Sequence, residues 1–65
     1  MDIGELTTWY GFHLLNKDDI EITRYLAMNG YSIYASGENV IFVYSEEFYY
    51  VKTILDDNRI KYKIL

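Results

Sequence analysis

Cysteine is absent from the sequence, and histidine occurs only once, as His13. Without cysteine the chain can form neither a disulfide nor a zinc site built on thiolates. A single histidine also rules out a metal site with several histidine ligands from one chain. We therefore expect no metal and no cofactor. Dense packing or self-association must replace the links that stabilise many small domains.

Catalytic signatures are missing as well. Nucleophilic catalysis needs a base beside a serine, cysteine or threonine, and the chain offers only His13 or an unusual lysine as that base. The sequence has no glycine-rich phosphate loop and no dinucleotide-binding fingerprint. We expect no catalytic residues and no enzymatic activity.

Long apolar runs are also lacking, since none approaches the roughly 20 residues needed to span a bilayer. Residues 1–5 are acidic and lack the basic and apolar parts of a secretion signal. The absence of cysteine is compatible with a reducing compartment. We therefore expect a cytoplasmic protein without a membrane partner.

Aromatic residues, in contrast, are abundant, with eight tyrosines, three phenylalanines and Trp9 among 65 residues. The length predicts a single domain over residues 1–65. A chain of this size buries only about 60% of the surface that its unfolded form exposes, so its core is small. Aromatic packing and self-association are the two supports that remain. We therefore expect a homodimer.

The formal net charge is −4 at pH 7. Affinity for nucleic acid depends on neutralising many phosphates, so this charge disfavours a general polyanion binder. It suits a protein partner with a basic surface.

The second half of the chain has the clearer pattern. Residues 40–44 are β-branched and aromatic, which predicts a buried strand. Ser45 is a candidate N-cap for a helix reaching about Asp57, with a buried stripe formed by Phe48, Val51, Ile54 and Leu55. Asn58 can adopt the left-handed conformation that ends a helix. Residues 59–65 alternate between basic and apolar side chains, which predicts a strand with one solvent-exposed face.

The first half repeats this order. Asp18 or Asp19 can cap a helix whose apolar side includes Ile22, Tyr25 and Leu26, and Asn29-Gly30 ends that helix. Residues 31–35 form a short alternating strand, and residues 36–39 turn it back as a hairpin.

Residues 6–15 carry two competing signals. Their composition is typical of a strand, and Gly11 disfavours a helix by about 1 kcal/mol relative to alanine. Leu6, Trp9, Tyr10, His13 and Leu14, however, recur at helical spacing. We favour the strand because it agrees with the order of the other elements. A helix here remains the alternative, giving an α-α-β-β-α-β chain.

The favoured order, β-α-β-β-α-β, resembles the ferredoxin-like α+β fold along nearly the whole chain. The resemblance concerns architecture and no specific motif. It implies a four-stranded antiparallel sheet with two helices on one face and the other face open. Because this fold hosts many activities, it does not identify a function.

Strand alternation then separates an inward set from an outward set. The inward set is Tyr10, Phe12, Leu14, Tyr31, Ile33, Ala35, Ile41, Val43, Ile60, Tyr62 and Ile64. The open face should carry an aromatic group edged by basic residues, and these are our candidate partner-binding residues: Trp9, His13, Tyr34, Phe42, Tyr44, Arg59, Lys61 and Lys63. An exposed aromatic cluster of this size usually marks an interaction surface.

We therefore expect a small protein-binding module that regulates or inhibits a larger protein, with the aromatic face used for dimerisation or partner binding. The abundance of Ile, Tyr, Asn and Lys is typical of AT-rich genomes, which fits a phage or mobile-element protein acting on a host or defence protein. The alternative is a module that binds single-stranded nucleic acid by stacking bases on the open sheet.

Overall fold

The computed structural model describes residues 8–65, and residues 1–7, including Leu6 and Thr7 of the ambiguous segment, lie outside the described part. The elements follow in the order β1 (Trp9–Leu14), the 3-10 helix η2 (Lys17–Glu21), α1 (Ile22–Met28), β2 (Ile33–Ser36), β3 (Val40–Tyr44), α2 (Ser45–Asp57) and β4 (Tyr62–Ile64). The strand predicted near the N-terminus is confirmed over residues 9–14, and the helical alternative is wrong there. Its alternating Phe12 and Leu14 are both fully buried, which a strand places on one side.

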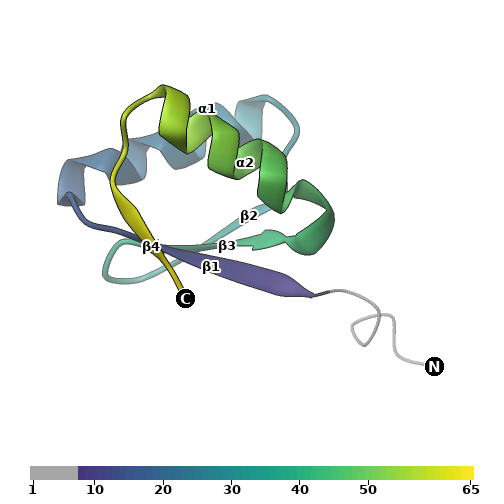
Figure 1. Cartoon of the computed structure of the whole chain (residues 1–65), viewed down its shortest axis with the longest axis horizontal. Helices are drawn as coiled ribbons and strands as arrows, with labels where there is room; N and C mark the ends of the chain where they lie inside the picture. Colours follow the sequence, from purple (N-terminus) through teal and green to yellow (C-terminus); the bar gives the residue numbers. More distant parts are fainter. Residues whose placement is uncertain (1–7) are drawn as a thin grey trace.

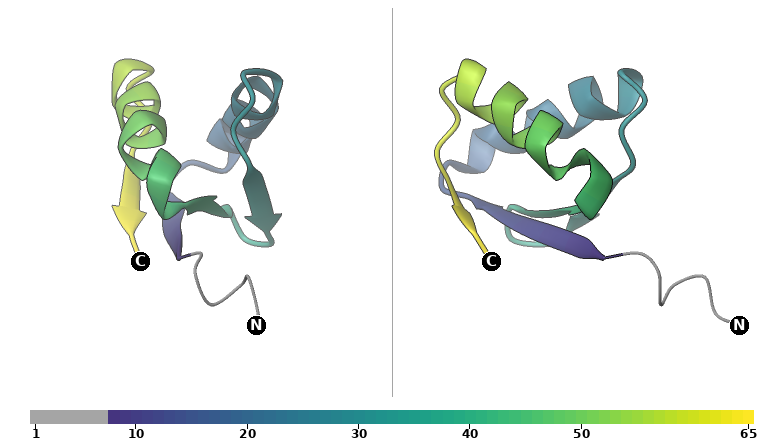
Figure 2. Two further views of the ribbon diagram at one scale, coloured as in Figure 1. Left: turned by 90° about the vertical axis from the view of Figure 1, so that its right-hand side faces the viewer. Right: turned by 45° about the vertical axis from the view of Figure 1, so that its right-hand side comes forward.

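The four strands form one antiparallel sheet in the order β2-β3-β1-β4. Figure 1 shows α1 and α2 above this sheet, and the turned views in Figure 2 show that both helices lie on the same side of it. The predicted α+β class, with an antiparallel sheet and two helices, is confirmed. Within residues 8–65 the opposite side of the sheet carries no helix.

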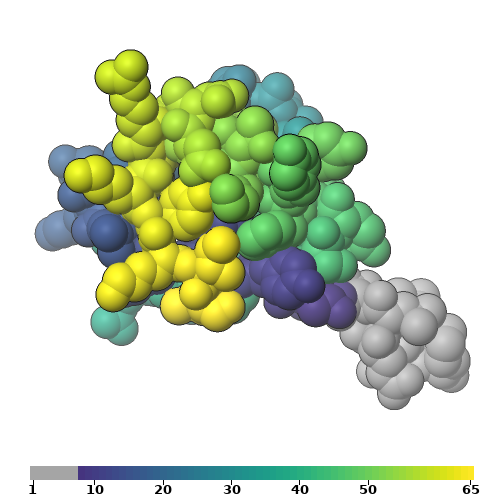
Figure 3. Space-filling view, in the orientation of Figure 1, coloured from purple at the N-terminus to yellow at the C-terminus, as the bar shows by residue number. Residues whose placement is uncertain are grey.

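The core lies between the helices and the sheet. Its fully buried strand residues are Phe12, Leu14, Ile41 and Val43, and its fully buried helix residues are Leu26, Val51 and Leu55. Phe48 stacks on Phe12, with 5.1 Å between ring centroids and 9° between ring planes. The space-filling view shows the side chains of α2, β4 and β1 joined in one continuous surface (Figure 3).

Both α-helices end with the same hydrogen-bond pattern. At the end of α1 the Gly30 N–H donates to Ala27 O, and the Tyr31 N–H donates to Leu26 O. At the end of α2 the Arg59 N–H donates to Asp56 O. These bonds, followed by an apolar residue that packs back on the helix, define a Schellman motif.

The residue in the left-handed region at the end of α2 is Arg59, with φ of 59°. The prediction that Asn58 takes this conformation is wrong, since its φ is −93°. Asn58 instead donates its side-chain amide to Ile54 O at 2.8 Å. At the end of α1 the corresponding residue is Gly30, as predicted, with φ of 91°.

The predicted helix starts need correction. Asn16, not Asp18 or Asp19, precedes the first helical turn, and its side chain makes no capping bond. Tyr44 precedes α2, so Ser45 is the first helical residue and not its N-cap. The chain enters α2 directly from β3, which leaves no separate capping residue between strand and helix.

Four residues assigned to the core are instead exposed. Tyr25 is 53% exposed on α1, and Ile64 is 51% exposed on β4. Ala35 lies near the hairpin end of β2 and is also exposed. Because β2 and β4 are edge strands, each has a neighbour on one side only. Tyr10 is 41% exposed, although its ring contacts Phe48 edge-on.

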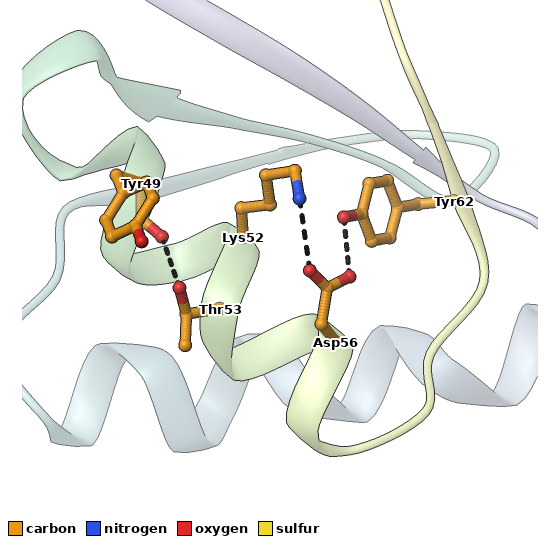
Figure 4. A network of polar contacts seen from close by, with 5 residues as sticks. All are labelled: Tyr49, Lys52, Thr53, Asp56 and Tyr62. Carbon is orange, nitrogen blue, oxygen red and sulfur yellow. Dashed lines mark hydrogen bonds and ion pairs between the residues drawn. The ribbon is translucent and has the colours of Figure 1, made fainter.

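A polar group joins β4 to α2 (Figure 4). The Tyr62 hydroxyl donates to Asp56 Oδ1 at 2.6 Å, and Lys52 Nζ donates to Asp56 Oδ2 at 3.1 Å. The hydrogen bond from Tyr62, followed by that from Lys52, holds the pKa of Asp56 below its usual value. Burial, followed by the bond to Asp56, raises the pKa of Tyr62. These contacts fix the last strand against the helix layer.

Candidate protein-interaction face

The side of the sheet away from the helices is defined by strand alternation. Phe12 and Leu14 point into the core, so His13 between them points to the other side. The same argument applies to each strand in turn. We call this surface the open face, and its residues are Trp9, Gly11, His13, Tyr34, Val40, Phe42, Tyr44, Lys63 and Leu65.

Two cross-strand aromatic pairs dominate the open face. Trp9 on β1 lies directly opposite Tyr44 on β3, with 4.4 Å between ring centroids and 44° between ring planes. Phe42 lies opposite Tyr34 on β2, with ring centroids 6.3 Å apart. Aromatic pairs of this kind stabilise a sheet by packing across the strands. Each also fixes the position of its partner's ring.

Gly11, Val40 and Leu65 are open-face residues that the sequence analysis did not select, and Gly11 matters most for the packing of the face. It lies opposite Phe42, and a Cβ atom added there would be 2.9 Å from Phe42 Cε1. The same atom would be 3.1 Å from Leu65 Cδ1. The Phe42 ring therefore rests on the backbone of β1, in space that any other residue would fill. A glycine inside a strand is the sequence signal for such a close approach.

Trp9, Tyr34 and Phe42 line a shallow hollow of about 450 Å³ on the open face. Its walls stay accessible, with Trp9 44% exposed and Tyr34 61% exposed. Phe42 and Tyr44, which pair across the strands with Tyr34 and Trp9, are half-buried. Five candidate residues, namely Trp9, His13, Tyr34, Phe42 and Tyr44, therefore lie together on the face as the sequence predicted.

The basic residues are only partly where the sequence placed them. Lys63 lies on β4 opposite His13, on the open face. Lys61 lies before β4, where its carbonyl accepts a hydrogen bond from the Leu15 N–H. Arg59 lies at the end of α2, since β4 begins only at Tyr62. The predicted basic row of three residues on one strand is therefore wrong for Arg59, whereas Lys63 lies within β4 and Lys61 lies directly before it, beside β1.

Negative charge is segregated from the open face. Within residues 8–65 none of the four strands contains an aspartate or a glutamate. The carboxylates of the described part lie on the helices and turns: Asp18, Asp19, Glu21, Glu38, Glu46, Glu47, Asp56 and Asp57. Glu47 accepts a bond from the Ser32 N–H, and Asp56 belongs to the group with Tyr62. In residues 8–65 no group of three or more acidic or histidine side chains is placed to hold a metal ion.

A second aromatic group lies on the outer surface of α2. Tyr49 and Tyr50 are 72% and 59% exposed, and their rings meet edge-on at 6.2 Å between centroids. The hollow of the open face is lined by other residues. The acidic residues Glu46 and Asp57 lie on the same helix. This surface is a useful reference for the open face because it offers similar aromatic side chains on an acidic helix.

Comparison with known proteins identifies no relative. No protein-family model matches the chain, and no curated protein and no solved structure matches it either. Within the described residues, no helix is both long enough and apolar enough to cross a membrane. The geometry of the open face is therefore the basis for a functional proposal.

Proposed function

We propose that the chain is a non-enzymatic protein-binding module that docks through its open face. The observation that carries this proposal is the hollow lined by Trp9, Tyr34 and Phe42 on strands that contain no carboxylate. Tryptophan and tyrosine are the side chains that most often anchor protein interfaces, where truncating one costs about 2 kcal/mol or more. Such an anchor must be both accessible and held in place.

The open face meets both requirements. Trp9 and Tyr34 remain accessible, and their contacts with Tyr44 and Phe42 already restrict their rotamers in the free protein. The two side chains therefore lose little conformational entropy on binding. Docking on this face removes little charge from water, because among residues 8–65 Lys63 and His13 are the ionisable side chains on it apart from the tyrosines. The net charge of the chain predicts a partner with a basic surface, but the open face itself is an apolar surface with a basic edge, which suits an uncharged or weakly acidic protein surface.

A nucleic-acid module uses aromatic rings on the central strands in a similar way, and Trp9, Phe42 and Tyr44 occupy those strands. It also needs cations that follow the phosphate backbone. Arg59 lies in the helix layer, so the open face offers mainly Lys63 for this purpose. The charge distribution favours a protein partner.

A module of this kind binds to a surface of its partner and blocks that surface. In this way the module regulates or inhibits the partner. The β-α-β-β-α-β order and the antiparallel strand order β2-β3-β1-β4 also support a ferredoxin-like arrangement. In that arrangement a sheet face left free by both helices is the natural docking surface.

Site-specific photo-cross-linking tests the proposal. Benzoylphenylalanine replaces Tyr34 on the open face in one variant and Tyr49 on α2 in a matched control, and both are irradiated in the cells that produce the protein. We expect covalent adducts with protein from position 34 and few from position 49. Adducts with nucleic acid at position 34, or protein adducts at position 49 alone, would overturn the proposal.

A further inference from the structure

We infer that the partner on the open face is a second copy of this chain, with the two sheets packed face to face across a two-fold axis. This inference rests on the proposed function, because it names the occupant of the same surface. The axis runs parallel to the strands, between the two sheets, and passes over the boundary of β1 and β3 at the centre of each sheet.

The first argument is the separation of charge. The chain carries a net charge of −4, yet its four strands contain no carboxylate. Both helices lie on the side of the sheet away from the open face (Figure 2). Packing two open faces together therefore buries no carboxylate from the described strands and leaves the acidic helices on the two outer sides of the dimer. Contact through the helices would instead bring like charges together, which costs free energy.

The second argument is a complementary pair at one end of the sheet. Lys63 on the β4 edge lies in register with His13, and His13 lies in register with Val40. Val40 directly follows the turn at residues 37–39, which contains Glu38. Lys63 and Glu38 therefore lie at the same end of the strands but towards opposite edges of the sheet.

A two-fold axis parallel to the strands exchanges the two edges and keeps the two ends. It therefore brings Lys63 of each copy over the turn that carries Glu38 of the other copy. Because the contact is isologous, the pair forms twice. Both side chains are exposed in the single chain, and neither has a salt-bridge partner among the described residues.

The third argument concerns the centre of the face. Phe42 on β3 and Gly11 on β1 are in register on either side of the axis, as are Tyr44 and Trp9. The axis places Phe42 over Gly11 of the other copy and Trp9 over Tyr44 of the other copy. Within each chain the Phe42 ring and Leu65 already fill the space over Gly11, so the two sheets meet here through the aromatic rings of Phe42, Trp9 and Tyr44.

The alternative of joining two sheets edge to edge has less support. The edge strands β2 and β4 contain only four and three residues. Short edge strands are a common protection against pairing with another sheet. Such pairing also leaves the hollow and its aromatic rings uncovered.

The size of the face sets the strength of the dimer. With strands about 4.8 Å apart and about 3.3 Å per residue, the sheet presents a footprint of roughly 19 × 17 Å. Stable interfaces bury about 800 Å² on each partner, which is more than this footprint supplies. We therefore expect a dimer that dissociates on dilution, with a Kd in the micromolar range or above.

Charge reversal tests the geometry, with sedimentation equilibrium of the purified chain as the measurement. Lys63→Glu and Glu38→Lys should each weaken the dimer about tenfold, since each turns two attractive contacts into repulsive ones. The double variant should recover the wild-type Kd to within about threefold. Arg24→Glu and Asp57→Lys change the net charge by the same amounts on the helices and should leave the Kd unchanged.

A wild-type chain that stays monomeric at millimolar concentration would overturn the inference. So would single variants that weaken the dimer without recovery in the double variant. In either case, protein adducts from position 34 that contain a different chain would leave the proposed function intact. Far-ultraviolet circular dichroism of every variant confirms that a lost dimer does not reflect a lost fold.

Discussion

Replacing Arg59 by glycine should stabilise the protein. Arg59 has φ of 59°, in the left-handed region where a residue with a side chain costs roughly 1–2 kcal/mol. Glycine removes that strain but loses about 0.5–1 kcal/mol through the greater freedom of its unfolded state. The net gain in the free energy of unfolding should be about 0.5–1 kcal/mol. For a domain of this size the gain raises the Tm by about 2–8 °C.

Gly30→Ala is the matched control at the end of α1. Its φ is 91°, and no atom lies within 4 Å of a Cβ added there, so the change acts through the backbone alone. The free energy of unfolding should therefore fall by about 1 kcal/mol. The two substitutions make opposite changes at equivalent positions of the two Schellman motifs.

Urea denaturation followed by circular dichroism measures both variants, at a protein concentration below the Kd of the dimer. A destabilised Arg59→Gly variant with an unchanged m-value would refute the assigned backbone conformation of the α2 end. The same variant also tests the site. Because Arg59 lies in the helix layer, its loss should leave self-association unchanged.

Two further predictions concern β4 and the centre of the open face. Tyr62→Phe removes the main cause of the lowered pKa of Asp56. A lowered carboxyl pKa stabilises the fold above the unfolded pKa, about 3.9, and this contribution is lost as the pH falls through the folded pKa. The stability difference between wild type and Tyr62→Phe should therefore persist at neutral pH and shrink below about pH 4, as measured by urea denaturation; a difference independent of pH contradicts it. Gly11→Ala should push the Phe42 ring and Leu65 outward and weaken the dimer about tenfold, while the free energy of unfolding changes by less than about 1 kcal/mol. Sedimentation equilibrium measures the Kd of the dimer. An unchanged Kd would show that the position of the Phe42 ring does not affect self-association.

The element order could be predicted because several signals agreed locally. The β-branched run at residues 40–44 and the helical stripe of Val51 and Leu55 each had one interpretation, and both are confirmed. Gly30 marked the end of α1 for the same reason, since glycine adopts positive φ without steric cost. For residues 9–14 the local pattern allowed a strand or a helix, and only the order of the other elements favoured the strand.

The wrong predictions concern positions whose conformation or role depends on tertiary contacts. After glycine, asparagine is the residue that most readily ends a helix in the left-handed conformation, yet the side chain of Asn58 bonds to Ile54 O and the next residue, Arg59, takes that conformation. Arg59 therefore belongs to the end of α2 and not to β4, and it does not lie at the candidate site. The sequence identifies Gly11 only as a residue that disfavours a helix, because its packing role depends on Phe42, a neighbour that only the strand register brings close.

A dilution series of amide spectra tests the central claim most directly. ¹⁵N-labelled protein is followed from about ten times the Kd to well below it, and each amide shift is assigned. The account predicts concentration-dependent shifts on β1, β3 and β4 and at the turn of residues 37–39, with the outer surface of α2 unchanged. Shifts confined to the helices would contradict the open face as the contact surface, and an unchanged spectrum would contradict the dimer.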